Sequence, residues 1–114
     1  LINIAAFDVA SIFDEDENTV SNATRFISGK PVDDVQNAII AAAKKLGSTS
    51  RRRTAARVIF NNNQNGQVVT MRTYQVVPGI CVYDFSRDEG GRDKFHVWFD
   101  GVKSDPQVAE CIKP

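Results

Sequence analysis

The sequence predicts a single α+β domain in which one helix packs on an antiparallel sheet of four to five strands. Three observations predict this fold class. Asn65-Gly66, the strongest short-range hairpin signal, lies between two β-rich runs. Residues 31–46 have apolar side chains at helical spacing. Further short β-rich runs follow, separated by turn residues, and a helix followed by antiparallel strands is an α+β order.

Length and composition place the chain among ordinary globular domains. At 114 residues it can bury one core, and its 14 basic and 14 acidic residues give a formal net charge of zero. No run of about 18 apolar residues occurs, so we expect no membrane span. The chain begins at Leu1 without a charged and apolar leader, as expected of a trimmed mature protein or a subcloned fragment.

The first 25 residues form an N-terminal extension to a core that we place at residues 26–114. Residues 1–13 are apolar without clean periodicity and are interpreted as a short strand or helix. Asp14–Asn18 is expected to be a solvated acidic turn, and Thr19–Ile27 a second short strand that ends before Ser28-Gly29.

The segment from Pro31 to Leu46 is the predicted helix. Pro31 suits the first helical position, and two aspartates follow it where the helix dipole is positive. Gly47 is suited to the position just after the helix. The apolar stripe that would lie on the sheet consists of Val32, Val35, Ile39, Ala42 or Ala43, and Leu46.

After the helix, a polar basic loop over Ser48–Arg53 leads into the strands. Another hairpin loop is expected at Arg87–Arg92 because it contains Gly90-Gly91. Lys94–Phe99 alternates, so His96 and Trp98 should lie on one side of a strand. The predicted strands are Ala55–Phe60, Gln67–Val77, Ile80–Phe85, Lys94–Phe99 and a short last strand, Gln107–Ile112, that places Cys111.

A basic region is the first candidate site. No carboxylate occurs between Asp34 and Asp84, so the cations there create a local positive field that could hold a phosphate backbone, with one tyrosine for stacking. The alternative is a solvated loop whose arginines serve solubility or pair with the acidic N-terminal turn. The candidate RNA-binding or partner-binding residues are Lys44, Lys45, Arg51, Arg52, Arg53, Arg57, Arg72 and Tyr74.

The residues typical of catalytic and metal sites are few. His96 is the only histidine, which excludes a two-histidine mechanism and gives no metal site, and we expect no cofactor. Cys81 has apolar neighbours, which disfavour a nucleophilic thiolate. Cys81 and Cys111 are compatible with one disulfide or with two buried thiols. The cysteines and the glycosylation sequon at Asn22 together favour secretion.

Gln75-Val76-Val77-Pro78-Gly79 resembles the Gln-x-Val-x-Gly hairpin of the cystatins, which inhibit cysteine proteases and also place a helix before a sheet. The resemblance implies a wedge that fills a protease cleft with backbone. It covers about a fifth of the chain. Trp98 is followed by Phe99 and not preceded by proline, which departs from the family's second loop.

About three quarters of the chain, from Phe26 to Cys111, is similar in pattern and order to the fungal guanyl-specific ribonucleases. The closer likeness is to the ribonuclease-like secreted effectors of plant-pathogenic fungi such as the powdery mildews. The segments that carry it are Ser28-Gly29-Lys30-Pro31-Val32 before the helix, the long strand with Arg72-Thr73-Tyr74-Gln75-Val76-Val77, the strand Ile80–Phe85, Val97-Trp98-Phe99-Asp100-Gly101, and Val108-Ala109-Glu110-Cys111.

This resemblance implies a pseudoenzyme. The family's catalytic glutamate falls at Thr73, its arginine near Cys81 and Val82, and its histidine at Phe99. The base for a ribose 2′-hydroxyl and the cation for the phosphorane are therefore absent. The family also ties an early cysteine to the last one, whereas here no cysteine precedes Cys81, so a disulfide would join Cys81 to Cys111.

We therefore expect a monomeric, non-catalytic secreted fungal virulence effector of ribonuclease-like fold that binds host RNA or a host protein, such as an immune receptor or a protease, and no membrane. One alternative is the cystatin-like inhibitor acting through Gln75–Gly79. The other is an active ribonuclease that uses His96 with a carboxylate such as Asp84 or Asp100.

Overall fold

The sheet is the centre of the computed structural model, which describes residues 2–3 and 24–113. Five antiparallel strands lie side by side in the order β2 (Arg25–Ser28), β6 (Ile80–Glu89), β5 (Gln67–Val77), β4 (Arg57–Asn62) and β3 (Thr49–Thr54). A short strand, β1 (Ile2–Asn3), pairs in parallel with Tyr74 and Gln75 of β5. The α+β class and the antiparallel sheet are therefore confirmed.

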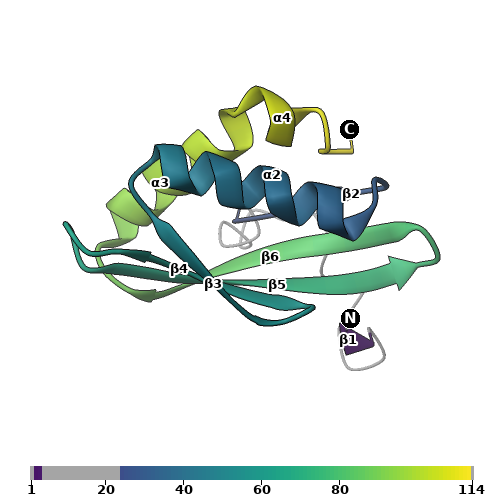
Figure 1. Ribbon diagram of the computed structural model, residues 1–114, viewed down its shortest axis with the longest axis horizontal. Coiled ribbons are helices and arrows are strands. Elements are labelled where there is room, and N and C mark those ends of the chain that lie inside the picture. Colours follow the sequence, from purple (N-terminus) through teal and green to yellow (C-terminus); the bar gives the residue numbers. More distant parts are fainter. Residues whose placement is uncertain (1, 4–23, 114) are drawn as a thin grey trace, which may run out of the picture.

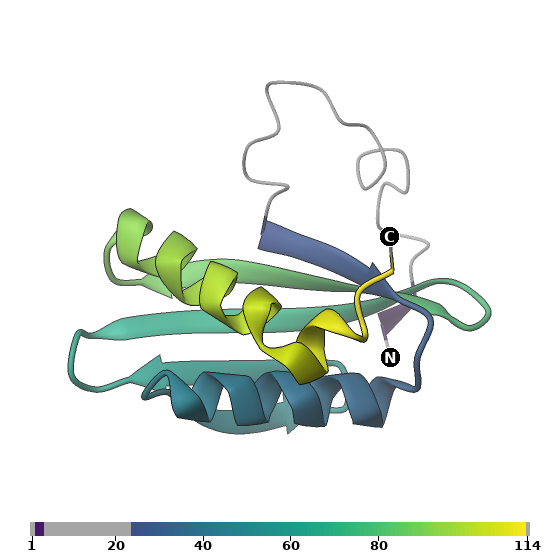
Figure 2. The same cartoon turned by 90° about the horizontal axis from the view of Figure 1, so that it is seen from above.

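The helices of the described residues cover one face of this sheet (Figures 1 and 2). They are α2 (Val32–Lys45), α3 (Arg92–Ser104) and the short α4 (Pro106–Ala109). The helix expected to pack on the sheet is α2, whereas α3 and α4 were not expected. We call the opposite side of the sheet, which carries Arg57, Arg72 and Asp84, the far face.

Helix α2 forms where the sequence predicts it. Asp33 and Asp34 occupy its first turn and Lys44 and Lys45 its last, so charges of the right sign lie at both ends of its dipole. Gly47, with φ of 87°, follows the helix in a conformation that favours glycine. The side chains that α2 buries against the sheet are Val35, Gln36, Ile39, Ala42 and Ala43.

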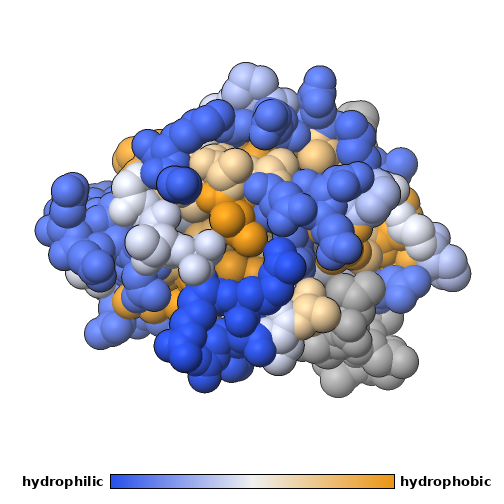
Figure 3. Space-filling model, viewed as in Figure 1, coloured by the Kyte–Doolittle hydropathy of each residue, from blue (hydrophilic) through white to orange (hydrophobic). Residues whose placement is uncertain are grey.

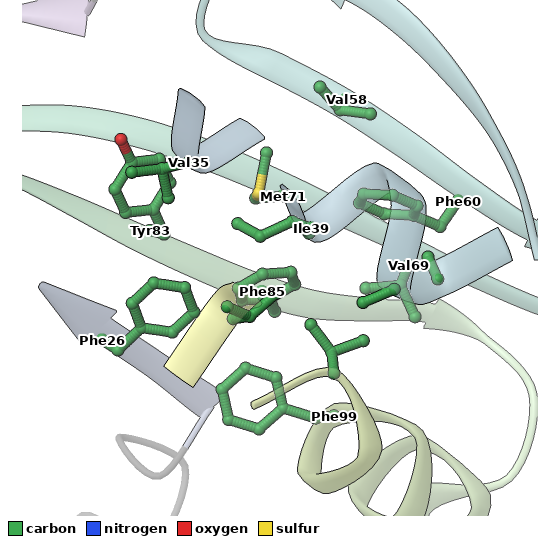
Figure 4. Close-up of a cluster of buried hydrophobic side chains, with 14 of the residues drawn as sticks. Phe26, Val35, Ile39, Val58, Phe60, Val69, Met71, Tyr83, Phe85 and Phe99 are labelled. Atoms are coloured by element: carbon green, nitrogen blue, oxygen red, sulfur yellow. The ribbon is translucent and has the colours of Figure 1, made fainter. Parts of the chain in front are cut away.

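The core lies between the sheet and the helices, and Figure 4 shows many of its side chains. Alternate residues of the strands point into it, as Val58 and Phe60 of β4 do. Aromatic rings dominate near α3, where the Phe85 and Phe99 centroids are 5.0 Å apart. Burying each such side chain stabilises the fold by roughly 1.5–3 kcal/mol. The core therefore holds the strands, and with them the residues of the far face, in fixed positions.

The expected hairpin around Asn65-Gly66 is present, joining β4 to β5, with Gly66 at a φ of 72°. The segment Ser48–Arg53 is not a loop, because residues from Thr49 onward form the edge strand β3. An exposed edge strand is stabilised by backbone pairing and needs no apolar residue, so hydropathy does not reveal it. Ala55 and Ala56 make the turn, and β4 therefore begins at Arg57.

The predicted strand Lys94–Phe99 is wrong, because these residues lie in α3. Strand β6 continues to Glu89, so the expected hairpin loop at Arg87–Arg92 is a strand-to-helix junction instead. The side chains that α3 buries are Phe95, Trp98, Phe99 and Val102. Their spacing of three, four and seven residues is helical, and the apparent alternation Phe95-Val97-Phe99 is only part of that pattern.

The predicted last strand, Gln107–Ile112, is also wrong. Asp105 caps α4 by accepting a hydrogen bond from the Gln107 backbone N–H, and Pro106 occupies the first turn. Cys111 follows this helix, and its thiol donates to the Gln107 carbonyl at 3.3 Å. Cys81 and Cys111 are both buried and free, so the structure contains no disulfide between them.

Several expectations fall on residues outside the described part. These are the glycosylation sequon at Asn22, the acidic turn Asp14–Asn18 and most of the segment 1–13, of which Ile2 and Asn3 alone are described, as β1. The expected strand Thr19–Ile27 is described only from Thr24, and β2 begins at Arg25. Among the helices of the described residues, none has the length and apolar character to cross a membrane.

Candidate nucleic-acid interface

Five arginines of the predicted basic region lie on three adjacent strands. We call them the arginine strip: Arg51, Arg52 and Arg53 on β3, Arg57 on β4 and Arg72 on β5. All six residues of β3 are exposed, because β3 is an edge strand. The most hydrophilic, dark-blue surface in Figure 3 lies over β3. The strand register therefore gathers the arginines at one edge of the sheet.

The strip continues from the edge onto the far face. Arg51 is opposite Ile59 and Arg57 is opposite Arg72, so Arg51, Arg57 and Arg72 project to the same side. Two like charges directly opposite one another destabilise a sheet. The buried Nε of Arg57 has no hydrogen-bond partner, and no ion pair between described residues involves a residue of the strip. The charges of Arg51, Arg52, Arg53 and Arg57 are thus available to an anion, whereas Arg72 lies opposite Asp84.

One carboxylate interrupts the cationic row across the far face. Asp84 of β6 lies opposite Arg72 on one side and Arg25 of β2 on the other, and Arg25 Nε is 3.6 Å from its carboxylate. Arg72 also donates to the Ser86 hydroxyl at 3.2 Å. Burial raises the pKa of the Asp84 carboxyl, although Arg25 and Arg72 act in the opposite direction. The row therefore has three arginines and one partly desolvated acid.

The other predicted binding residues are placed less uniformly. Lys44 and Lys45 lie in the last turn of α2, on the helical side of the molecule. Lys45 donates to the Asp105 carboxylate at 2.9 Å, so its charge is already paired within the protein. Tyr74 is half-buried two residues after Arg72 on β5, where it pairs with β1. The binding residues brought together are therefore the five arginines and, beside them, Tyr74.

A second cationic site lies at the other side of the sheet, and the sequence analysis does not predict it. β2 pairs with β6 only as far as Asp84, and a pocket of about 460 Å³ opens beyond it against α3. We call it the β6–α3 pocket. Its lining residues are Thr24, Arg25, Asp84, Phe85, Ser86, Arg87, Arg92, Phe95 and His96.

His96 is on a helix and not on a strand, and it lines this pocket together with Asp84. Asp100, the other carboxylate considered as its partner, is not part of the pocket and lies 3.8 Å from Lys103. Among the described residues, no group of three or more histidine, cysteine, aspartate or glutamate side chains could hold a metal ion. The pocket offers cations, hydroxyls and a single carboxylate instead.

The positions matched to the ribonuclease catalytic residues lie in the interior. Thr73, Cys81, Val82 and Phe99 are all buried, and burial also raises the pKa of the Cys81 thiol. The cystatin-like segment Gln75–Gly79 comprises the last three residues of β5 and the exposed turn Pro78-Gly79 before β6, with Gly79 at a φ of 82°. Trp98 is buried and donates to the Ser48 hydroxyl, so it is not presented as a second loop.

Comparisons with known proteins return no relative: no protein-family model matches the sequence, and neither does any curated protein. The geometry of the arginine strip and of the β6–α3 pocket therefore carries the functional argument.

Proposed function

We propose that the protein binds RNA through the arginine strip and does not cleave it. The observation that carries this proposal is the pair Arg57 and Arg72, which lie opposite each other on the adjacent strands β4 and β5 without a carboxylate between them. Such a pair costs stability in the free protein, and a phosphate backbone relieves that cost. Arg51, Arg52 and Arg53 extend the positive surface, and in this proposal a base contacts Tyr74, two residues after Arg72 on β5.

The biological setting in this proposal comes from the resemblance to ribonuclease-like fungal effectors. On that basis the protein is a secreted, monomeric effector and the RNA is host RNA. The absence of hydrolysis rests on the same resemblance, because the family's catalytic positions hold Thr73, Cys81, Val82 and Phe99. A host protein bound at the same surface is the outcome to consider if RNA does not bind.

The experiment is a binding titration with labelled single-stranded and structured RNA at about 50 and about 200 mM salt. The test variant replaces Arg51, Arg52 and Arg53 with serine. We expect weaker binding and a salt slope shallower by about 2, since each phosphate contact in a single strand contributes about 0.7 to the slope. These three side chains are exposed, so the fold should be retained.

The matched control replaces Lys30, Lys94 and Lys113 with serine. These lysines are exposed, lie outside the arginine strip and pair with no described carboxylate, so the variant loses the same net charge. RNA affinity should fall much less in this control. Equal losses in the two variants would mean that net charge alone governs binding, and a wild-type protein that does not bind RNA contradicts the proposal.

A second candidate function is RNA cleavage at the β6–α3 pocket. The observation that favours it is that His96 and Asp84 line one pocket with three arginines. The His96 imidazole and the Asp84 carboxyl could exchange protons with the 2′-hydroxyl and the leaving 5′-oxygen, and the guanidinium groups could stabilise the phosphorane. RNA cleavage that disappears in His96→Ala would establish this function and overturn the non-catalytic proposal.

A further inference from the structure

The β6–α3 pocket has the size and position of a ligand site separate from the arginine strip. It opens where β6 extends beyond β2 and where the first turns of α3 begin. Its volume of about 460 Å³ is within the range of small-molecule sites. A lone inorganic phosphate would fill only part of this space, whereas a mononucleotide would fill much more of it.

The charges around the pocket select an anion. Three guanidinium groups, those of Arg25, Arg87 and Arg92, face one carboxylate, so the formal charge is three minus one, or two positive. Asp84 is already beside Arg25 at 3.6 Å, which leaves Arg87 and Arg92 for a ligand. The positive end of the α3 dipole adds to the same field.

Arg87 and Arg92, the two arginines left for a ligand, lie at the end of β6 and the start of α3. Arg87 donates to the Gly90 carbonyl at 2.8 Å, which fixes its guanidinium beside the junction between β6 and α3. Arg92 is the first residue of α3, so its backbone is ordered by the helix. Guanidinium groups bind phosphate oxygens with paired hydrogen bonds, and Arg87 and Arg92 both line the pocket at this junction.

The floor of the pocket suits the rest of a nucleotide. Phe85 and Phe95 are buried beneath it, and the ring of His96 lies 5.5 Å from that of Phe95. Thr24 and Ser86 add hydroxyl groups to the lining. The His96 ring is partly exposed, so a flat base can stack on it, and a ribose can bond to the hydroxyls. An anion with both parts therefore matches this lining better than a simple acid.

We propose that the β6–α3 pocket binds the phosphate monoester of a nucleotide. The ligand is either a free nucleoside 5′-monophosphate or the 5′-phosphorylated end of an RNA strand, because both present the same phosphate and base. The site is distinct from the arginine strip, and binding of a free nucleotide does not depend on RNA binding by the strip.

The test is calorimetric titration of the full chain with guanosine 5′-monophosphate, adenosine 5′-monophosphate and the two unphosphorylated nucleosides. These ligands contain no phosphodiester bond, so binding is measured without cleavage. We expect the monophosphates to bind and the nucleosides to bind at least about tenfold more weakly, since each lost charge-assisted hydrogen bond is worth a factor of ten or more. Short RNAs with a 5′-phosphate or a 5′-hydroxyl distinguish the two ligand sources.

The variant Arg87→Gln/Arg92→Gln should weaken monophosphate binding by about tenfold to a hundredfold. The control Lys30→Gln/Lys113→Gln loses the same charge outside the pocket and should bind as the wild type does. All four side chains are exposed, so neither variant should unfold. Equal binding of monophosphate and nucleoside, equal losses in both variants, or no nucleotide binding at millimolar concentration would overturn the proposal.

The strip variant Arg51→Ser/Arg52→Ser/Arg53→Ser separates this site from the proposed RNA interface. It should retain nucleotide binding while losing affinity for RNA. If the wild type binds no RNA but does bind nucleoside monophosphates, the proposed function fails and the pocket proposal stands. If RNA binds and nucleotides do not, the reverse holds.

Discussion

At the scale of single residues, Gln36 joins α2 to the turn between β3 and β4 and to β5 through one buried amide. Its Nε2 donates to the Ala55 carbonyl at 3.0 Å and to the Thr73 hydroxyl at 3.2 Å. Gln36 is 1% exposed and Thr73 0%, so water cannot replace the bond between these two side chains. Ala55 is in the turn that ends β3, which means that this amide fixes the turn between Arg53 and Arg57 of the arginine strip.

Replacing Gln36 with leucine should lower the free energy of unfolding by about 2–3 kcal/mol, because the Ala55 carbonyl and the Thr73 hydroxyl lose their donor. Asn37→Leu is the matched control, since Asn37 is exposed on the same helix and should change stability by less than about 0.5 kcal/mol. Urea denaturation of both variants measures the difference. Similar midpoints for the two variants would contradict a role for the buried amide.

The reactivity of the two cysteines tests whether their side chains are free thiols or a disulfide. Both thiols are buried and free, and burial raises the pKa of Cys81. We expect neither to react with a thiol reagent within minutes in the native state, since the thiolate is the reactive form. After unfolding in guanidinium without reductant, both should react. If the unfolded protein has no reactive thiol while a reduced control has two, the predicted disulfide is present.

Residue by residue, the candidate site could be predicted from sequence only where its members are neighbours in the chain. The arginines Arg51, Arg52 and Arg53 are consecutive and lie in a stretch without carboxylates, so local composition reveals them. The β6–α3 pocket joins Thr24 and Arg25 to lining residues of β6 and α3, which lie far from this pair in the sequence although β6 and α3 follow one another. Predicting α3 as a strand removed the helix that completes the pocket.

At the scale of elements, the accuracy of the prediction follows the length of the pattern. α2 has Pro31 before it, Gly47 after it, charges at both ends and an apolar stripe over four turns, and the predicted bounds are within one residue of the observed ones. In α3, Gly101 precedes Val102 and separates it from the other apolar residues. In the two turns before Gly101, apolar residues occupy every second position, and this alternation predicts a strand. β3 has no apolar residue at all, because an edge strand needs only a paired neighbour.

The contact between Lys45 and Asp105 connects the end of α2 to the start of α4. The hydrogen bond from Lys45 lowers the pKa of the Asp105 carboxyl, to which the Gln107 backbone N–H also donates. A carboxyl whose pKa is lowered in the folded state stabilises the protein at pH values above its ordinary pKa of 3.8. This contribution to stability is lost as the pH falls through the pKa of the folded state. The contact should therefore weaken in acid.

Asp105→Asn keeps an oxygen for the α4 cap but removes the charge, so its melting temperature should fall less than that of the wild type between about pH 5 and pH 2. At neutral pH the variant should be the less stable protein. Glu110→Gln is the control, because Glu110 is exposed and forms no ion pair with a described residue. Thermal melts across this pH range test the prediction, and parallel curves for wild type and Asp105→Asn would contradict it.

At the scale of the whole molecule, zero net charge conceals a division of charge between surfaces. The arginine strip and the three arginines of the β6–α3 pocket are joined across the far face by the row Arg57, Arg72, Asp84 and Arg25. Asp84 is the single carboxylate in that row. A phosphate backbone that follows the row from β3 to β6 would pass close to this acid, which should limit RNA affinity at the far face.

Asp84→Asn should therefore raise RNA affinity severalfold at about 50 mM salt, with a smaller gain at about 200 mM because salt screens the repulsion. Asp93→Asn changes net charge equally and is exposed on α3 away from the row, so its gain should be smaller. The measurement is the RNA titration at both salt concentrations. Equal gains in the two variants would mean that the far face is not the RNA surface.

Stability gives a second readout of the same substitution. Because burial raises the pKa of Asp84, its ionisation opposes folding, and this cost grows as pH rises from the ordinary value of 3.8 through the folded pKa. Asp84→Asn removes the ionisable group, so it should be more stable than the wild type at neutral pH and lose that advantage in acid. A variant that is both more stable and tighter for RNA would identify Asp84 as a residue whose charge opposes folding and binding alike.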